Sequence, residues 1–120
     1  MAEIVDRYLE AVVTHDWDAF ASCLSEDVTR IGPFGDTYNP KAPYVEYISK
    51  LMPTLEDYSM HVDRISDTEN LTVVELTESM RFGETLHVTP EVLIFEIGAD
   101  GLISKIDIFI KRLGDPPKLV

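Results

Sequence analysis

Apolar side chains near the start of the chain repeat with the period of an α-helix. The repeating positions are Ile4, Val5, Tyr8, Leu9, Val12 and Val13. Charged residues such as Asp6 and Glu10 occupy the opposite face, so the pattern predicts an amphipathic helix. Tyr8 is the member of this stripe that carries a hydroxyl group. A buried phenol requires a hydrogen-bond partner, which a polar pocket beside the helix would supply.

A second short helix is predicted after a break at His15-Asp16, with Asp16 as its N-cap. Its inward positions are Trp17, Phe20, Ala21 and Leu24. Residues 28–31 favour a β-strand, and the turn sequence Gly32-Pro33-Phe34-Gly35 ends it.

A third helix is predicted after a loop over residues 36–42. Pro43 suits the first helical position, and Pro53 stops the helix. The apolar stripe of this helix consists of Tyr44, Val45, Ile48, Leu51 and Met52.

From Tyr58 onward the hydrophobic period changes from that of a helix to the period of two that is typical of strands. The predicted strands cover residues 58–66, 71–81, 85–97 and 102–111, and short turns join them. Helices followed by an antiparallel meander indicate an α+β fold. One face of a long, curved sheet would wrap around the three helices and leave a cavity. A single domain over residues 1–113 and a tail over 114–120 are expected.

The composition narrows the possible functions. A chain of 120 residues can bury one core, and a net charge of −12 argues against nucleic acid as a partner. We expect no membrane interaction, because no apolar run is long enough for a span and no signal peptide is recognised. The lone Cys23 excludes an internal disulfide and is expected to be a buried, inert thiol, so a cytoplasmic location is predicted.

Several local motifs carry a resemblance to a known family. They are Tyr8-Leu9-Glu10-Ala11, Asp16-Trp17-Asp18, Leu24-Ser25-Glu26-Asp27-Val28 and Gly32-Pro33-Phe34-Gly35. With the order of the elements, they make the chain resemble the SnoaL-like branch of the nuclear transport factor two-like superfamily. The resemblance implies a cone-shaped α+β barrel with a pocket at its wide end. It also implies a homodimer built on the outer face of the sheet.

The closest local similarity within that superfamily is to bacterial ketosteroid isomerases. Their oxyanion-hole tyrosine matches Tyr8, and their protonated pocket aspartate is best matched by Glu91, which is one methylene longer. Their general base is the aspartate directly before Pro-Phe-Gly, where this chain has Gly32. The resemblance therefore implies two of the three catalytic roles and argues against steroid isomerisation by that mechanism.

Alternation along the strands selects the residues that would face the pocket. A two-residue turn at Phe82-Gly83 would pair Glu78 with His87, whereas a three-residue loop would turn these side chains to the other face. The candidate catalytic residues are Tyr8, Arg30, Glu78, His87 and Glu91. The candidate ligand-binding residues are Leu24, Val74, Leu76, Met80, Thr89, Leu93, Ile106 and Ile108.

An imidazole beside a carboxylate can act as a general acid or base. The sequence therefore predicts a cofactor-independent isomerase, cyclase or dehydratase that acts on a small hydrophobic molecule. The alternative is a non-catalytic ligand-binding or dimerisation module, in which Glu78 and His87 are an ordinary cross-strand pair and Arg30 pairs with a buried acid. Epoxide hydrolysis is a third possibility. It calls for an Asp-Arg-Asp arrangement around a water molecule, which cannot be placed in this sequence. The spacing of the three histidines does not favour a metal site, and no cofactor is expected.

Overall fold

The computed structural model describes residues 3–114, which begin with two helices. Helix α1 spans Glu3–Thr14 and α2 spans Trp17–Ser22. The chain turns between them at His15, which has a φ of 57°. Asp16 is the N-cap of α2, as predicted, because its carboxylate accepts a hydrogen bond of 3.1 Å from the amide of Ala19.

The next segment departs from the sequence prediction in three places. Strand β1 spans Leu24–Ile31, so Leu24 begins a strand and does not lie on the second helix. A two-residue strand, β2 at Thr37–Tyr38, occupies part of the predicted loop. Helix α3 spans Lys41–Leu51, starting before Pro43, and the 3-10 helix η1 at Met52–Thr54 contains Pro53.

The four long strands lie where the alternating pattern predicts them. They are β3 at Glu56–Asp67, β4 at Leu71–Phe82, β5 at Thr85–Ile97 and β6 at Ile103–Ile110. The observed bounds of β5 coincide with the predicted ones. The other three differ from the prediction by one or two residues at their ends, which is the usual uncertainty of a strand boundary.

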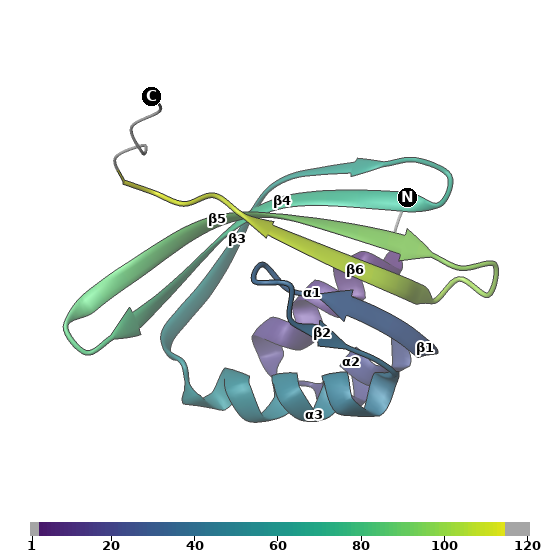
Figure 1. The fold of residues 1–120 in the computed structure, drawn as a ribbon, viewed down its shortest axis with the longest axis horizontal. Coiled ribbons are helices and arrows are strands. Elements are labelled where there is room, and N and C mark those ends of the chain that lie inside the picture. Colours follow the sequence, from purple (N-terminus) through teal and green to yellow (C-terminus); the bar gives the residue numbers. More distant parts are fainter. Residues whose placement is uncertain (1–2, 115–120) are drawn as a thin grey trace.

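The strands form one six-stranded sheet in the order β2-β1-β6-β5-β4-β3. All neighbouring pairs are antiparallel except β1 and β6, which run parallel. The sheet bends strongly and the three helices lie on its concave side (Figure 1). The predicted α+β class and helix-on-sheet arrangement are confirmed. The sheet is open, however, with β2 and β3 at its edges, so the barrel does not close.

The register of the β4–β5 hairpin differs from the one predicted. Its two-residue turn is Gly83-Glu84, with Phe82 opposite Thr85. Glu78 therefore lies opposite Thr89, and the predicted pair of Glu78 with His87 is wrong. Because the register differs by two positions, each side chain keeps its predicted face of the sheet while its cross-strand neighbour changes.

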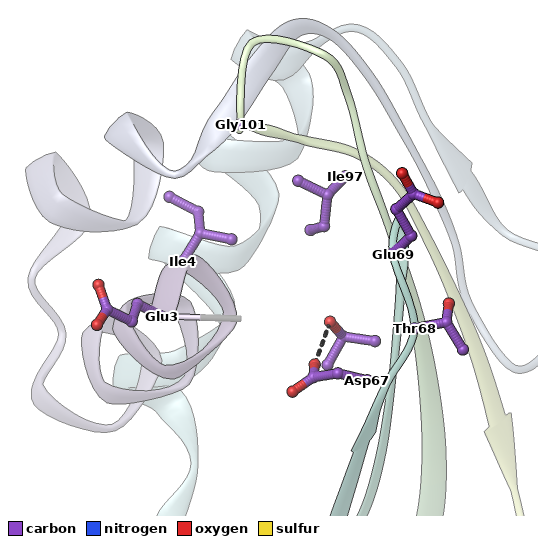
Figure 2. Close-up of a pocket in the computed structure, with 8 residues that line it drawn as sticks. Glu3, Ile4, Asp67, Thr68, Glu69, Ile97 and Gly101 are labelled. Atoms are coloured by element: carbon purple, nitrogen blue, oxygen red, sulfur yellow. Dashed lines mark hydrogen bonds between the residues drawn. The ribbon is translucent and has the colours of Figure 1, made fainter. Parts of the chain in front are cut away.

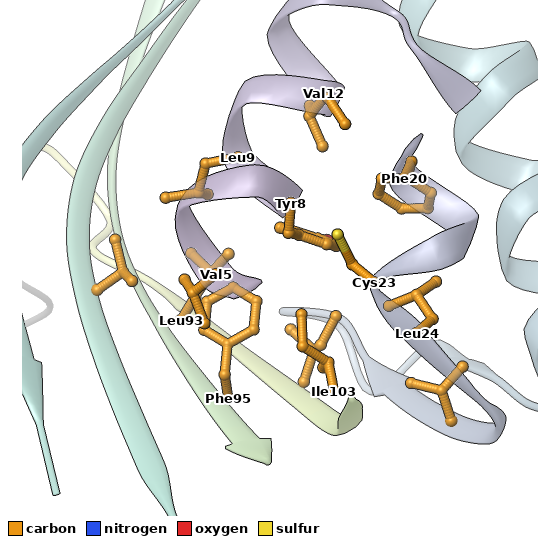
Figure 3. Close-up of a cluster of buried hydrophobic side chains, with 14 of the residues drawn as sticks. Val5, Tyr8, Leu9, Val12, Phe20, Cys23, Leu24, Leu93, Phe95 and Ile103 are labelled. Carbon is orange, nitrogen blue, oxygen red and sulfur yellow. The ribbon is translucent and has the colours of Figure 1, made fainter. Parts of the chain in front are cut away.

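The core fills the space between α1, α2 and the concave face of the sheet (Figure 3). Val5, Phe20, Leu24 and Phe95 are fully buried, and Tyr8 packs on Phe20 and Phe95 at centroid distances of 4.9 and 5.2 Å. This packing fixes the ring of Tyr8 and so fixes where its hydroxyl group lies.

Two predictions concern the limits of the domain and the membrane. Apart from Gly114, the predicted tail over residues 114–120 lies outside the described residues. Between residues 3 and 114, no helix has the length and apolar character that a membrane span requires.

Candidate functional site

A cavity of about 160 Å³ lies between α1, α3 and the concave face of the sheet. We call it the Tyr8 cavity. The polar residues in its wall are Tyr8, Arg30, Tyr44, Glu78 and Glu91. The remaining wall is apolar and includes Val12, Ile48, Met52, Met60, Leu76 and Leu93. A few convergent polar groups in an apolar cavity are typical of small-molecule sites.

Two buried tyrosines from different helices meet in this cavity. The hydroxyl groups of Tyr8 on α1 and Tyr44 on α3 lie 2.5 Å apart. Burial raises the pKa of Tyr8, and the neighbouring Tyr44 adds to this effect. Burial also raises the pKa of Tyr44 to about 12, although Tyr8 and the Arg30 cation act in the opposite direction. Both phenols therefore keep their protons at neutral pH, and the pair can donate a hydrogen bond to a ligand oxygen.

Two carboxyl groups enter the cavity from the sheet, Glu78 from β4 and Glu91 from β5. Burial and then the neighbouring Glu78 raise the pKa of Glu91 to about 9, by hydrogen bonding and by charge. Glu91 therefore holds a proton at neutral pH. On β3, the hydroxyl group of Tyr58 donates a hydrogen bond to Glu78 Oε2. Burial and the charge of Glu78 raise the pKa of Tyr58 well above its usual range.

Arg30 on β1 is the basic residue of the cavity wall. Its side chain is 9% exposed, and Nη1 donates a hydrogen bond of 2.8 Å to Asp36, whose side chain is 39% exposed. The Arg30 guanidinium lies 5.8, 5.8 and 5.5 Å from the ring centroids of Tyr38, Tyr44 and Tyr47. Burial would lower the pKa of Arg30, but Tyr44 and Asp36 outweigh this and raise it.

The turn after β1 folds the Asp36 side chain back over Gly32. The amide of Gly32 donates a hydrogen bond of 2.8 Å to the carbonyl oxygen of Asp36. A Cβ atom built on Gly32 would lie 2.4 and 2.6 Å from the Asp36 carboxylate oxygens and 2.6 Å from Arg30 Nη1. The ion pair of Arg30 with Asp36 thus occupies the space of a side chain at position 32.

The structure brings four of the five predicted catalytic residues together in the Tyr8 cavity, namely Tyr8, Arg30, Glu78 and Glu91. His87 does not line it. The imidazole of His87 is exposed on the β4–β5 hairpin and packs edge-on against Phe82 at a centroid distance of 4.9 Å. The β4–β5 hairpin extends beyond the helices there (Figure 1).

The predicted ligand-binding residues divide into three groups. Leu76, Leu93 and Ile108 line the Tyr8 cavity. Leu24, Val74 and Ile106 are buried in the core next to it. Met80 and Thr89 are half-buried on the β4–β5 hairpin.

Three polar residues that contact the site, Tyr44, Tyr58 and Asp36, are not among the predicted site residues. Tyr44 lies in the apolar stripe of the third helix, and its hydroxyl group was the same signal that singled out Tyr8. Tyr58 precedes Met60 by two positions on one strand, so alternation alone could have placed it on the inner face. Asp36 gave no signal, because its position depends on the conformation of the turn at residues 32–36.

A second hollow of about 260 Å³ lies at the other end of α1 (Figure 2). Glu3 and Ile4 face the β3–β4 turn across it, and Asp67 accepts a hydrogen bond of 2.9 Å from Thr72. Its charged lining residues are all acidic: Glu3, Asp67 and Glu69. Over the residues that the structure describes, no three potential metal ligands of the His, Cys, Asp or Glu type come together.

Several solved structures share the fold of this chain. A protein with a ketosteroid isomerase-like fold from Catenulispora acidiphila DSM 44928, solved in complex with trimethylamine, is 13% identical, with a TM-score of 0.78 over 89% of this chain and 84% of that chain. An LEH-like epoxide hydrolase from M. tuberculosis is 15% identical, with a TM-score of 0.81 over 92% of this chain and 81% of that chain.

A provisionally named SnoaL-like polyketide cyclase from Shewanella denitrificans OS-217 is 11% identical, with a TM-score of 0.81 over 91% of this chain and 88% of that chain. At these identities the similarity concerns the fold alone. No curated protein matches the sequence. The profile of the SnoaL-like domain matches residues 5–106, which is most of the chain. The protein therefore belongs to the SnoaL-like domain family.

Proposed function

We propose that the Tyr8 cavity catalyses proton transfer on a small, largely apolar carbonyl compound, as a cofactor-independent isomerase, cyclase or dehydratase does. The observation that carries the proposal is the pair of Glu78 and Glu91, two carboxyl groups in an apolar cavity of which one holds its proton at neutral pH. A carboxyl group that keeps its proton close to a second carboxyl group is a common arrangement in acid–base catalysis.

Each group has a role in this proposal. The Glu78 carboxylate removes a proton from the carbon next to the carbonyl group, and the electron pair of that C–H bond forms the C=C bond of an enolate. The negative charge moves to the oxygen, which accepts hydrogen bonds from protonated Glu91 or from the Tyr8–Tyr44 pair. Glu78 then returns the proton to a different carbon. Tyr58 orients Glu78 through its hydrogen bond.

In this proposal Glu78 acts as the base in place of His87, the residue predicted from the sequence. His87 is exposed, so in this proposal it takes no part in the reaction. The alternative of an epoxide hydrolase has weaker support, because among the described residues Arg30 forms an ion pair with Asp36 and with no second carboxylate. Its structural neighbour of that activity shares only the fold.

The test uses the isomerisation of cyclohex-3-enone to cyclohex-2-enone, which is followed by the ultraviolet absorbance of the conjugated product. We expect the wild-type protein to accelerate the reaction. Glu78→Gln is expected to reduce kcat about 100-fold or more, the usual contribution of a general base. Glu91→Gln keeps a hydrogen-bond donor and is expected to lose less.

The matched control is Glu96→Gln. Glu96 lies on β5 like Glu91, but on the outer face of the sheet and exposed to solvent, so its substitution should leave the rate unchanged. A wild-type protein that binds cyclohexenones without converting them, or a Glu78→Gln variant with full activity, would contradict the proposal. The first outcome would favour a non-catalytic ligand-binding module.

We also propose that the protein acts as a homodimer that contacts its partner through the outer sheet face, and that it is located in the cytoplasm. The lone thiol supports the second part, since Cys23 is 1% exposed and burial raises its pKa. A thiol of this kind needs no oxidising compartment.

A further inference from the structure

Arg30 is a buried cation whose hydrogen-bonding capacity is incompletely used. Its exposure is 8%, yet Nε has no hydrogen-bond partner among the described residues. Among the nitrogens of Arg30, Nη1 is the one that donates a hydrogen bond to the Asp36 carboxylate. The Asp36 side chain is itself 39% exposed, so solvent screens part of its charge. A buried charge that is only partly compensated is costly to retain unless a further partner binds to it.

The guanidinium group is also held in place before any ligand arrives. Three tyrosine rings surround it at 5.5 to 5.8 Å, with Tyr38 and Tyr47 stacked on each other at a centroid distance of 4.2 Å. Arg30 therefore cannot turn outward without losing its contacts with all three rings. A planar guanidinium fixed in this way is suited to bind a carboxylate through two hydrogen bonds.

The position of Arg30 also indicates what it contacts. Arg30 lines the Tyr8 cavity, whereas Asp36 does not. The resemblance to ketosteroid isomerases puts a base at position 32, and here Arg30 Nη1 and the Asp36 carboxylate fill that space. Asp36 is a poor replacement for the base: partial burial raises its pKa, but the hydrogen bond from Arg30 and the charge of Arg30 outweigh this and lower it. The group that this chain offers to a ligand at this corner is a cation.

We propose that the natural ligand of the Tyr8 cavity is a carboxylate with a compact apolar body, and that Arg30 binds its carboxylate group. This rests on the proposed function in that both concern the same cavity. The Tyr8 cavity has a volume of about 160 Å³, close to the ~150 Å³ of a cavity that binds benzene. The apolar body of the ligand is therefore expected to be about the size of a single ring. The protein carries a net charge of −12, so long-range attraction cannot account for binding of an anion. The preference must arise from the local contact with Arg30.

The test compares phenylacetate with phenylacetamide, which has the same shape and no charge. Titrations of the full chain, followed by NMR chemical shifts, give the dissociation constant of each probe. We expect the wild-type protein to bind phenylacetate at least tenfold more tightly. Arg30→Met should abolish this preference while the amide binds as before, which also shows that the variant is folded. Arg30→Lys should retain part of the preference.

The matched control is Arg64→Met. Arg64 is an exposed arginine on β3 that pairs with Glu75, so its loss should not change the ratio of the two constants. Asp36→Asn provides a second readout should Arg30→Met fail to fold. It removes the competing carboxylate and should increase the preference for phenylacetate. Equal binding of the two probes by the wild-type protein, a preference retained in Arg30→Met, or an unchanged preference in Asp36→Asn would overturn the proposal.

Failure of this inference is distinguishable from failure of the proposed function. Binding of phenylacetate involves no turnover, so Glu78→Gln should keep the preference for the carboxylate even where catalysis is lost. If the protein prefers phenylacetate but converts no carbonyl compound, the proposed Arg30 site is supported and the proposed acid–base role of Glu78 is refuted. If the protein isomerises cyclohex-3-enone but does not prefer the carboxylate, the acid–base role of Glu78 is supported and the Arg30 site is refuted.

Discussion

Glu91 and Glu78 bring two carboxyl groups into one apolar cavity. Both carboxyl groups enter from neighbouring strands, and the apolar wall around them disfavours two charges at close range. Glu91 therefore keeps its proton at a pH where an exposed glutamate has lost it. This protonation has a consequence for stability that can be measured without knowing the substrate.

Glu91→Gln is expected to stabilise the protein increasingly as pH rises from 5 to 8. The unfolded chain loses the Glu91 proton near its ordinary pKa of 4.5, whereas the folded protein keeps it to about 9. The unfolded state therefore binds fewer protons in this window, and wild-type stability falls by at most about 1.4 kcal/mol per pH unit. Urea denaturation of the wild-type protein and the variant at pH 5 and pH 8 measures the difference in unfolding free energy, with Glu96→Gln as the control. A stability difference that does not depend on pH would contradict the assignment.

The hydroxyl groups of Tyr8 and Tyr44 are expected to be energetically coupled. Tyr8→Phe or Tyr44→Phe alone leaves a buried hydroxyl without its partner, which costs about 1–3 kcal/mol of unfolding free energy. The double variant should cost less than the sum, since no unpaired hydroxyl remains, with an interaction energy of about 0.5–3 kcal/mol. A double-mutant cycle by urea denaturation measures it. Additive losses would mean that the two hydroxyl groups do not depend on each other.

At the scale of the elements, β1 and the turn that follows it decide which charged groups reach the cavity. Gly32 is required there for space, because a Cβ atom would overlap the ion pair of Arg30 with Asp36. The turn places a carboxylate from four residues later in the space that a side chain at position 32 would fill. Local backbone conformation thus changes the chemistry of this corner.

Gly32→Ala is expected to destabilise the protein by about 1–3 kcal/mol, because the added methyl group must displace Asp36 or Arg30. In an Asp36→Ala background the same substitution should cost clearly less, since the nearest obstructing atoms are gone. Urea denaturation of the four proteins measures both effects. An equal cost in the two backgrounds would show that Asp36 does not occupy this space.

The sequence predicts elements well where one periodicity dominates. Long alternation in residues 85–97 gives β5 its observed bounds. The start of β1 is missed because Leu24 continues the helical spacing of Trp17 and Phe20, and packing against the core overrides that local pattern. Two-residue β2 is too short to produce a pattern.

The candidate site could be predicted only in part, for a related reason. Alternation determines the face on which Glu78 and Glu91 lie, and that prediction agrees with their place in the cavity wall. It does not determine which residues are opposite each other, because one turn residue changes the register. The pairing of Glu78 with His87 is wrong for this reason, and the contact of Arg30 with Asp36 depends on a turn that periodicity does not describe.

At the scale of the whole molecule, the helices cover only the concave face of the sheet (Figure 1). On the opposite face Phe109 and Val88 are 52% and 43% exposed. Large, exposed apolar side chains on an uncovered sheet face support the proposal of an interaction surface there. In the proposed homodimer, these residues lie in the contact between the two copies of the chain.

Phe109→Asp is expected to shift the protein from dimer to monomer, because it would bury a charge in the proposed interface. Sedimentation equilibrium of the wild-type and variant chains measures the change. The control is Phe34→Asp, which alters a phenylalanine that is 87% exposed in the turn after β1 and should leave the dimer intact. A wild-type protein that sediments as a monomer would refute the homodimer.

The parallel pairing of β1 with β6 has a consequence for how the chain folds. Leu24 pairs with Ile103, about 80 residues later in the sequence, and β6 joins β1 to the meander of β5, β4 and β3. Contacts over such separations form slowly, because a long loop must close first. The part that carries Tyr8, Arg30 and Tyr44 and the part that carries Glu78 and Glu91 are therefore joined through the last strand. During synthesis, the cavity cannot form until that strand has left the ribosome.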